Sequence, residues 1–166
     1  MSPRVARALF VVAIVLGVWL LFDWYFSDTQ RIRRRLSEIQ RLVAKSPAES
    51  DLAAFAAARR LSELFAEPFE ARAEPAGYST ADRTQVASSV HQYRSRSTTL
   101  VMEILDEQIF LDAEGVGANS FFSARFLTDL GDLATSEQYD CKLHWIKVEG
   151  EWLIDHAQVT GVHALP

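Results

Sequence analysis

The chain has 166 residues, 49% of them hydrophobic, and a formal net charge of −5 at pH 7. This length suits one globular domain together with a membrane anchor. From position 97 onward three bases stand against twelve acids, so this part has no basic stripe and we expect no nucleic-acid partner. The single cysteine, Cys141, excludes an intramolecular disulfide and a cysteine-rich metal site.

The N-terminus predicts a membrane anchor. Residues 8–22, ALFVVAIVLGVWLLF, form a run of fifteen residues without a charge. A helix needs about 20 mostly apolar residues to cross a bilayer. The run reaches that length with its flanks, so the predicted span covers residues 6–26. Trp19, Trp24 and Tyr25 stand where an interfacial aromatic belt belongs.

Three interpretations of this segment compete. A cleaved signal peptide needs small residues after the apolar run, but here the run ends in Phe-Asp-Trp-Tyr-Phe. A buried core helix is the second interpretation. The aromatic flanks favour the third, an uncleaved single-pass anchor in the cell inner membrane, with the lipid bilayer as partner.

Basic residues follow the anchor. Eight bases lie within positions 31–60, and each base near an anionic leaflet contributes about 1 kcal/mol of attraction. We therefore predict contact with lipid headgroups or a partner through four arginines, Arg31, Arg33, Arg34 and Arg35. Because more bases follow the anchor than precede it, the positive-inside rule favours a cytoplasmic domain.

Residues 28–45 are predicted to form a basic juxtamembrane helix, capped by Asp28 or Thr29. Its apolar residues recur at spacings of four, three and four: Ile32, Leu36, Ile39 and Val43. Two interpretations stay open. The stripe packs on the chain's own domain, or it pairs two copies and extends the anchor as a stalk.

The segment Ser46-Pro47-Ala48-Glu49 is typical of a helix start, with Ser46 as N-cap and Glu49 completing a capping box. This helix is expected to run to Ala66, and Pro68 to end it. Its expected apolar face comprises Leu52, Phe55, Ala58, Leu61 and Phe65.

Ser79 together with Asp82 is predicted to open a third helix in the same manner. From Ser97 the apolar period changes to two, which is typical of strands. A bulge or tight turn is expected at Asp106-Glu107, and a hairpin turn at Glu149-Gly150. The predicted strands cover residues 100–105, 109–113, 120–128, 139–148 and 151–162, with a polar connection over 130–137.

This order of elements predicts an α+β domain with helices packed on a curved antiparallel sheet. With the ending LHWIKVEGEWLIDHAQV, the chain resembles the nuclear transport factor 2-like superfamily, whose domains form a cone. The resemblance covers about residues 46–162. We expect three parts in the chain: an anchor (1–27), a basic helix (28–45) and the cone domain (46–163). Similar domains behind one membrane helix usually lie outside the cytoplasm, which opposes the arginine count, so the side of the membrane stays open.

Enzymes of this superfamily place carboxylate or histidine bases inside the cone, and the last strand offers two. Strict alternation puts His156 on the face of Trp152 and Ile154. If that face is inward, His156 lines a pocket as a general base, beside Tyr139, Cys141 and Trp145. If the other face is inward, Asp155 is a buried carboxylate with a raised pKa. A structural role is favoured for both residues.

No other catalytic or cofactor motif occurs, so we expect no cofactor and no metal. His144 is expected on a solvated face, and the four histidines have no metal-ligand spacing. The sequence therefore favours a non-enzymatic scaffold domain that acts as a homodimer or as a subunit of a membrane complex. Pairing is expected through the open sheet face or the stripe of residues 32–43. The alternative is binding of a small apolar ligand, or isomerase, dehydratase or cyclase chemistry, in the cone.

Overall fold

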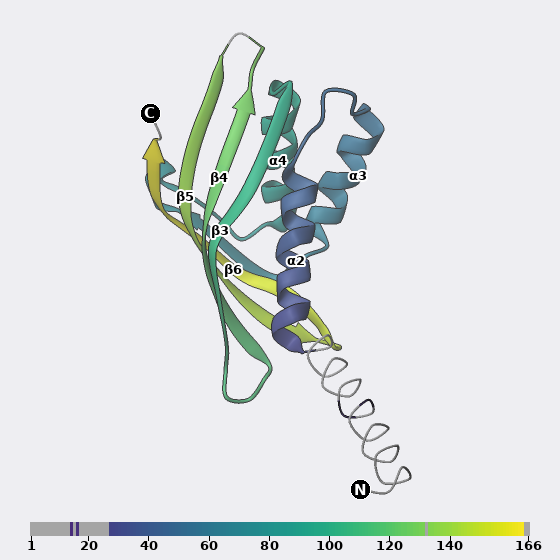
Figure 1. The fold of residues 1–166 in the computed structure, drawn as a ribbon, viewed down its shortest axis with the longest axis vertical. Coiled ribbons are helices and arrows are strands. Elements are labelled where there is room, and N and C mark those ends of the chain that lie inside the picture. The colour runs from purple at the N-terminus through teal and green to yellow at the C-terminus, as the bar shows by residue number, and fades with distance from the viewer. Residues whose placement is uncertain (1–13, 15, 17–26, 132, 165–166) are drawn as a thin grey trace, which may run out of the picture.

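The structure is a computed structural model that describes residues 14, 16, 27–131 and 133–164 (Figure 1). The predicted anchor at residues 6–26 therefore lies outside the described residues, apart from positions 14 and 16. In the described part of the chain, no helix has the length and apolar character that crossing a bilayer requires.

Helices and strands follow one another in the order expected of an α+β domain. The helices are α2 (Asp28–Val43), α3 (Asp51–Ser62) and α4 (Arg83–Arg96), with a 3-10 turn, η1, at Glu74–Ala76. The strands are β1 (Phe65–Ala73), β2 (Tyr78–Thr80), β3 (Thr99–Leu111), β4 (Gly117–Asp129), β5 (Ala134–Val148) and β6 (Glu151–Ala164).

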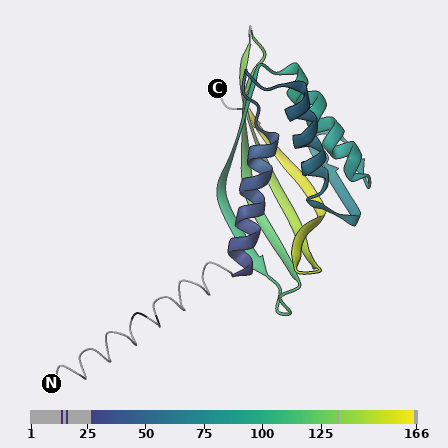
Figure 2. The same cartoon turned by 90° about the vertical axis from the view of Figure 1, so that its right-hand side faces the viewer.

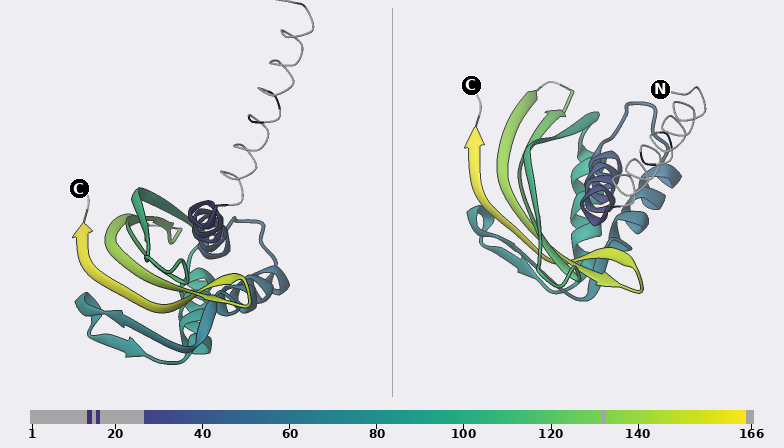
Figure 3. Two further views of the ribbon diagram at one scale, coloured as in Figure 1. Left: turned by 90° about the horizontal axis from the view of Figure 1, so that it is seen from below. Right: turned by 60° about the horizontal axis from the view of Figure 1, so that its bottom comes forward.

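The six described strands form one sheet in the order β2-β1-β6-β5-β4-β3. Strands β3 to β6 make an antiparallel meander, whereas β1 runs parallel to β6. The expectation of a wholly antiparallel sheet is therefore wrong at one strand pair, because β1 reaches the sheet from the helical part of the chain. The three helices cover one face of the sheet (Figure 2), and the sheet curves toward them (Figure 3).

The period-two pattern located the strands well. The predicted irregularity at residues 106–107 is confirmed, since the β3–β4 register shifts between Leu105 and Gln108. The final turn is confirmed too, with φ of 52° at Glu149 and 86° at Gly150, as a two-residue hairpin requires. Strand β5 begins at Ala134, so part of the predicted polar connection is strand that pairs with β4.

Helix α2 packs on the chain's own sheet. Ser27, rather than Asp28 or Thr29, caps it, because the Ser27 hydroxyl accepts a hydrogen bond from the Gln30 backbone. Ile32 and Leu36 are 0% and 1% exposed and belong to the same core cluster as the sheet residues. The interpretation of this stripe as a surface that pairs two copies is therefore wrong, since the domain's own core covers it.

The first turn of α2 is fastened to the β5–β6 hairpin. Lys147 Nζ and Trp152 Nε1 donate to the carboxylate of Asp28 at 2.9 and 3.0 Å. Burial opposes ionisation, but these two hydrogen bonds outweigh it and hold the pKa of Asp28 below its ordinary value. The point where the N-terminal segment joins the domain is thereby held against the sheet.

Helix α3 is shorter than predicted. It begins at Asp51 after the N-cap Ser50, not at Ser46, and it ends at Ser62. Pro68 lies within β1 instead of ending the helix. Of the expected apolar face, Leu52 and Phe55 are 79% and 63% exposed, while Leu61 is buried.

A buried ion pair explains why the helix does not start at residue 46. Glu49 accepts hydrogen bonds from Nη2 of Arg94 at 2.5 and 2.7 Å, and Arg94 also donates to the Leu42 carbonyl. The Arg94 side chain is 2% exposed and that of Glu49 15%. Glu49 therefore joins the loop after α2 to α4, and it does not form the predicted capping box.

We predict that Glu49→Gln lowers the free energy of unfolding by about 3–5 kcal/mol, because it leaves the buried Arg94 guanidinium without its counter-charge. Chemical denaturation measures the change. Glu63→Gln is the matched control, since Glu63 pairs with Arg60 on the surface and the expected loss is below about 1 kcal/mol. Equal losses in the two variants would contradict the assignment.

Candidate functional site

Large apolar side chains, including the predicted Trp145, Trp152 and Ile154, occupy the space between the helices and the sheet. Trp145, Trp152 and Ile154 are at most 1% exposed, and Trp145 Nε1 donates to the Ser120 hydroxyl at 2.8 Å. Phe122 packs in the same cluster. These three residues face inward, where they belong to a packed core in place of a pocket lining.

The two other predicted lining residues are poor candidates for chemistry. Cys141 packs against the core, and burial, followed by the charge of Asp140, raises the pKa of its thiol to about 12. Tyr139 donates to Glu137 at 2.6 Å, and burial together with this hydrogen bond raises the pKa of its hydroxyl above the ordinary value. Both groups therefore stay protonated at neutral pH and provide neither a thiolate nor a phenolate.

A β-bulge places His156 outside the cone. Trp145 pairs with Ile154 and His144 pairs with His156, so Asp155 is an extra residue on β6. Asp155 and His156 of β6 thus both oppose His144 of β5, and this two-to-one pairing is a β-bulge. The bulge interrupts the alternation after Ile154, and the prediction that His156 shares the face of Trp152 is wrong.

The bulge gathers three titratable side chains on the helix-free face. His144 Nδ1 hydrogen-bonds Asp155 Oδ1 at 2.6 Å, and His156 Nδ1 lies 3.0 Å from Asp155 Oδ2. Glu70 of β1 approaches from the other side, with Oε2 3.8 Å from His156 Nε2. The exposed fractions are 15% for Asp155, 36% for His144 and 62% for His156. The largely buried carboxylate of Asp155 therefore contacts the imidazoles of both His144 and His156.

Glu70, His144 and His156 line a depression of about 530 Å³ on the sheet surface. Arg72 borders it and donates to Glu70 at 2.8 and 2.6 Å, while Asn119 and Lys142 close it from β4 and β5. Asp155 is not the desolvated base inside the cone that the second sequence alternative required. Sequence reasoning missed His144 and Glu70, because they meet the other two residues only across strand ladders.

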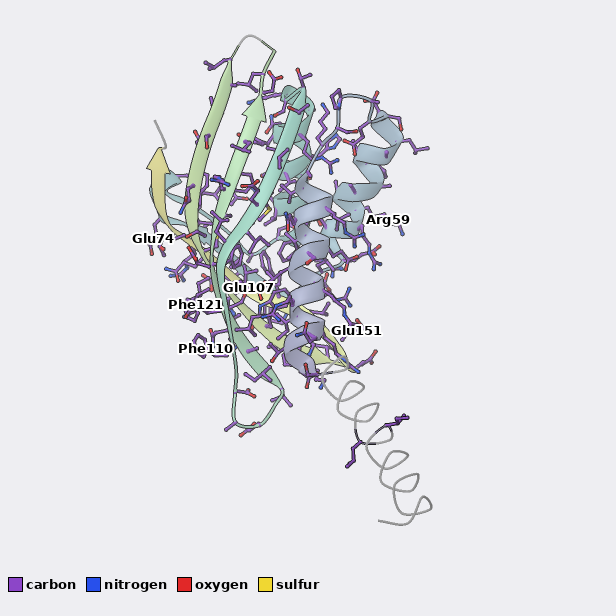
Figure 4. The ribbon with its side chains drawn as sticks, in the orientation of Figure 1. Arg59, Glu74, Glu107, Phe110, Phe121 and Glu151 are labelled. Atoms are coloured by element: carbon purple, nitrogen blue, oxygen red, sulfur yellow. The ribbon has the colours of Figure 1, made fainter. Side chains whose placement is uncertain are left out.

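The predicted headgroup arginines also contact the protein itself. Arg33 donates to Glu107 at 2.8 Å, Arg35 pairs with Glu38 and Glu151, and Arg31 donates to the Gly150 carbonyl. Glu107 and Glu151 are labelled in Figure 4, one beside α2 and one near its first turn. Contact of Arg31, Arg33, Arg34 and Arg35 with lipid stays a prediction.

Comparison with known proteins identifies the fold. No family model and no curated protein matches the chain. Among solved structures, a candidate scytalone dehydratase from Novosphingobium aromaticivorans is similar over 84% of this chain and 88% of its own, with a TM-score of 0.64 and 12% identity. An NTF2-like protein with a cystatin-like fold from the same organism is similar over 88% and 86%, with a TM-score of 0.62 and 14% identity.

A third similar structure is a candidate association domain of calcium/calmodulin-dependent protein kinase II from Xanthomonas campestris. It covers 74% of this chain and 94% of its own, with a TM-score of 0.53 and 17% identity. These similarities confirm the nuclear transport factor 2-like cone. At such low identity they show the fold alone.

The packed interior predicts that Cys141 is inert. At pH 8 a maleimide should react with Cys141 about 1,000-fold more slowly than with a fully exposed thiol, because the side chain is only partly accessible and its raised pKa leaves little thiolate. Mass spectrometry of the labelled chain measures the rates. The reference is Ser88→Cys in a Cys141→Ser background, since Ser88 is exposed on α4. Comparable rates would show that the cone is open.

Proposed function

We propose that this chain is an association domain held at the inner membrane by its N-terminal segment, and that it pairs with a second copy through the helix-free face of the sheet. The packed interior is the observation that carries this proposal. Because large apolar side chains occupy the cone, the outer surfaces are what remains for binding.

Apolar side chains on the helix-free face support pairing. Phe110 and Phe121 lie on the side of the sheet away from α2 (Figure 4), 56% and 40% exposed, with ring centroids 6.0 Å apart. Val101 and Leu127, a cross-strand pair on β3 and β4, are 44% and 37% exposed. Aromatic anchors of this kind dominate the binding energy of many interfaces.

An ion pair between the two apolar groups suits a two-fold partner. Glu103 and Arg125 are paired on β3 and β4, and each is 35% exposed. In a two-fold interface the same patch meets itself, so each copy offers both charges to its partner. We therefore commit to a second copy of this chain as the occupant of the face.

The predicted anchor strengthens pairing in this proposal. Residues 6–26 lead directly into α2, whose first residue, Asp28, is fastened to β5 and β6. Confinement to a membrane raises the effective concentration of the domains, which favours an interface too weak to hold in dilute solution. A similar structure is named as an association domain, which agrees with this role.

The alternative function is binding of an apolar ligand, or dehydratase-type chemistry, inside the cone. One similar structure is named for scytalone dehydratase. Such chemistry needs a general base inside the cone, but His156 lies on the outer face and is 62% exposed. Binding of an apolar ligand needs no base, but it needs space that the buried Trp145 and Trp152 occupy. Asp155 points to the same outer cluster. The association role is therefore the better supported of the two.

Pairing is tested with the full chain in detergent by sedimentation equilibrium over a range of protein concentrations. Phe110→Glu combined with Phe121→Glu should raise the dissociation constant at least about 30-fold, because two anchors are replaced by charges. The matched control is Leu52→Glu combined with Phe55→Glu, which changes an equally apolar exposed pair on α3 and should leave the constant unchanged. A wild-type chain that stays monomeric at every concentration would overturn the proposal.

A further inference from the structure

We propose that His144, Asp155 and His156 form a binding site for a zinc-class divalent cation on the helix-free face. The three potential ligand atoms, one from each residue, lie within 4.8 Å of one another. The site is independent of the association role, because it is built on β5 and β6 whereas the apolar groups lie on β3 and β4.

The β-bulge is the structural reason that these ligands converge. In a regular strand Asp155 and His156 would point to opposite faces. Because both residues oppose His144 across the ladder, the backbone instead directs their side chains toward the same imidazole. The distances of 2.6 Å from His144 and 3.0 Å from His156 to the two oxygens of Asp155 show the result.

The donor set selects the class of metal. Two imidazole nitrogens and one carboxylate oxygen are typical zinc ligands, whereas calcium and magnesium prefer sites made of oxygen. Donors around a tetrahedral zinc ion lie about 3.4 Å apart at ordinary bond lengths. The two separations from Asp155 are 2.6 and 3.0 Å, and all three ligand atoms lie within 4.8 Å of one another, so small side-chain rotations would bring them to that spacing. The depression beside His144 and His156 would give water access as a further ligand.

Glu70 lies where an outer-shell partner of His156 would be expected. Its Oε2 lies 3.8 Å from His156 Nε2, while the Nδ1 of the same ring faces Asp155. Metal-bound histidines usually donate the other ring N–H to a carboxylate, which fixes the tautomer and the ring orientation. Arg72 holds the Glu70 carboxylate at 2.8 and 2.6 Å. Glu70 is therefore a positioning residue for His156.

The neighbours of His144 leave the imidazole uncrowded. A Cβ at Gly117 would lie 3.6 Å from His144 Nε2, an ordinary van der Waals contact, and only Asp112 Oδ2, at 2.7 Å, would have to move. The ammonium of Lys142 lies 5.5 Å from the ring centroid of Phe121. The Lys142 ammonium thus has a favourable cation–π contact with Phe121, which lies away from the two imidazoles.

The test uses the full chain in detergent, purified without a histidine tag and stripped with a chelator. Equilibrium dialysis against zinc chloride, read by elemental analysis, should give one zinc ion per chain. His144→Ala and His156→Ala should each weaken zinc binding by more than about 100-fold, since each removes a ligand, and Glu70→Gln by about 10-fold, since it removes the outer-shell partner. His91→Gln, which removes a histidine from α4, is the count-matched control and should leave the affinity unchanged.

Circular dichroism of each variant without metal verifies that the fold is intact. Failure of the wild-type chain to bind stoichiometric zinc would overturn the proposal and leave the cluster as a hydrogen-bonded His–Asp–His network. Equal affinities in wild type and His144→Ala would overturn it as well, because zinc would then be bound elsewhere. Metal-free His144→Ala should still sediment as a dimer. Loss of zinc binding and loss of pairing can therefore be measured separately.

Discussion

The bulge at Asp155 on β6 is the constraint on which both faces of this sheet depend. Before the bulge Trp152 and Ile154 point into the core, and after it Ala157 packs against the same core. A strand of strict alternation could not place all three on one face. Because of the bulge, residues of β6 on both sides of it face the same core. The side chain of the extra residue, Asp155, points to the opposite face of the sheet.

A filled cone follows from this arrangement together with α2. The helix closes one side of the sheet with Ile32 and Leu36, and the two buried tryptophans occupy the volume that remains. Close packing of this kind stabilises the fold and removes the space in which an interior ligand would lie. Binding is therefore argued on the outer face, where β3 and β4 present aromatic side chains and the bulge presents imidazoles.

Much of the fold was predictable because it rests on local rules. Alternation along the last strands, the Glu149-Gly150 turn and the stripe on α2 are properties of neighbouring residues. The start of α3 was not predictable from the same rules. Glu49 satisfies the pattern of a capping box, yet it pairs with Arg94, forty-five positions further along, because the buried guanidinium needs a counter-charge.

The sequence by itself determined the class of the domain, the order of strands β3 to β6 along the chain and the two tryptophans of the core. Only the tertiary structure decided the direction of β1 and the face of His156. The direction of β1 depends on its pairing with β6, which lies far along the chain. The face of His156 depends on one extra residue in the β5–β6 ladder, because a shift of one residue reverses every side chain beyond it. The cluster of His144, Asp155 and His156 therefore exists only in the folded sheet.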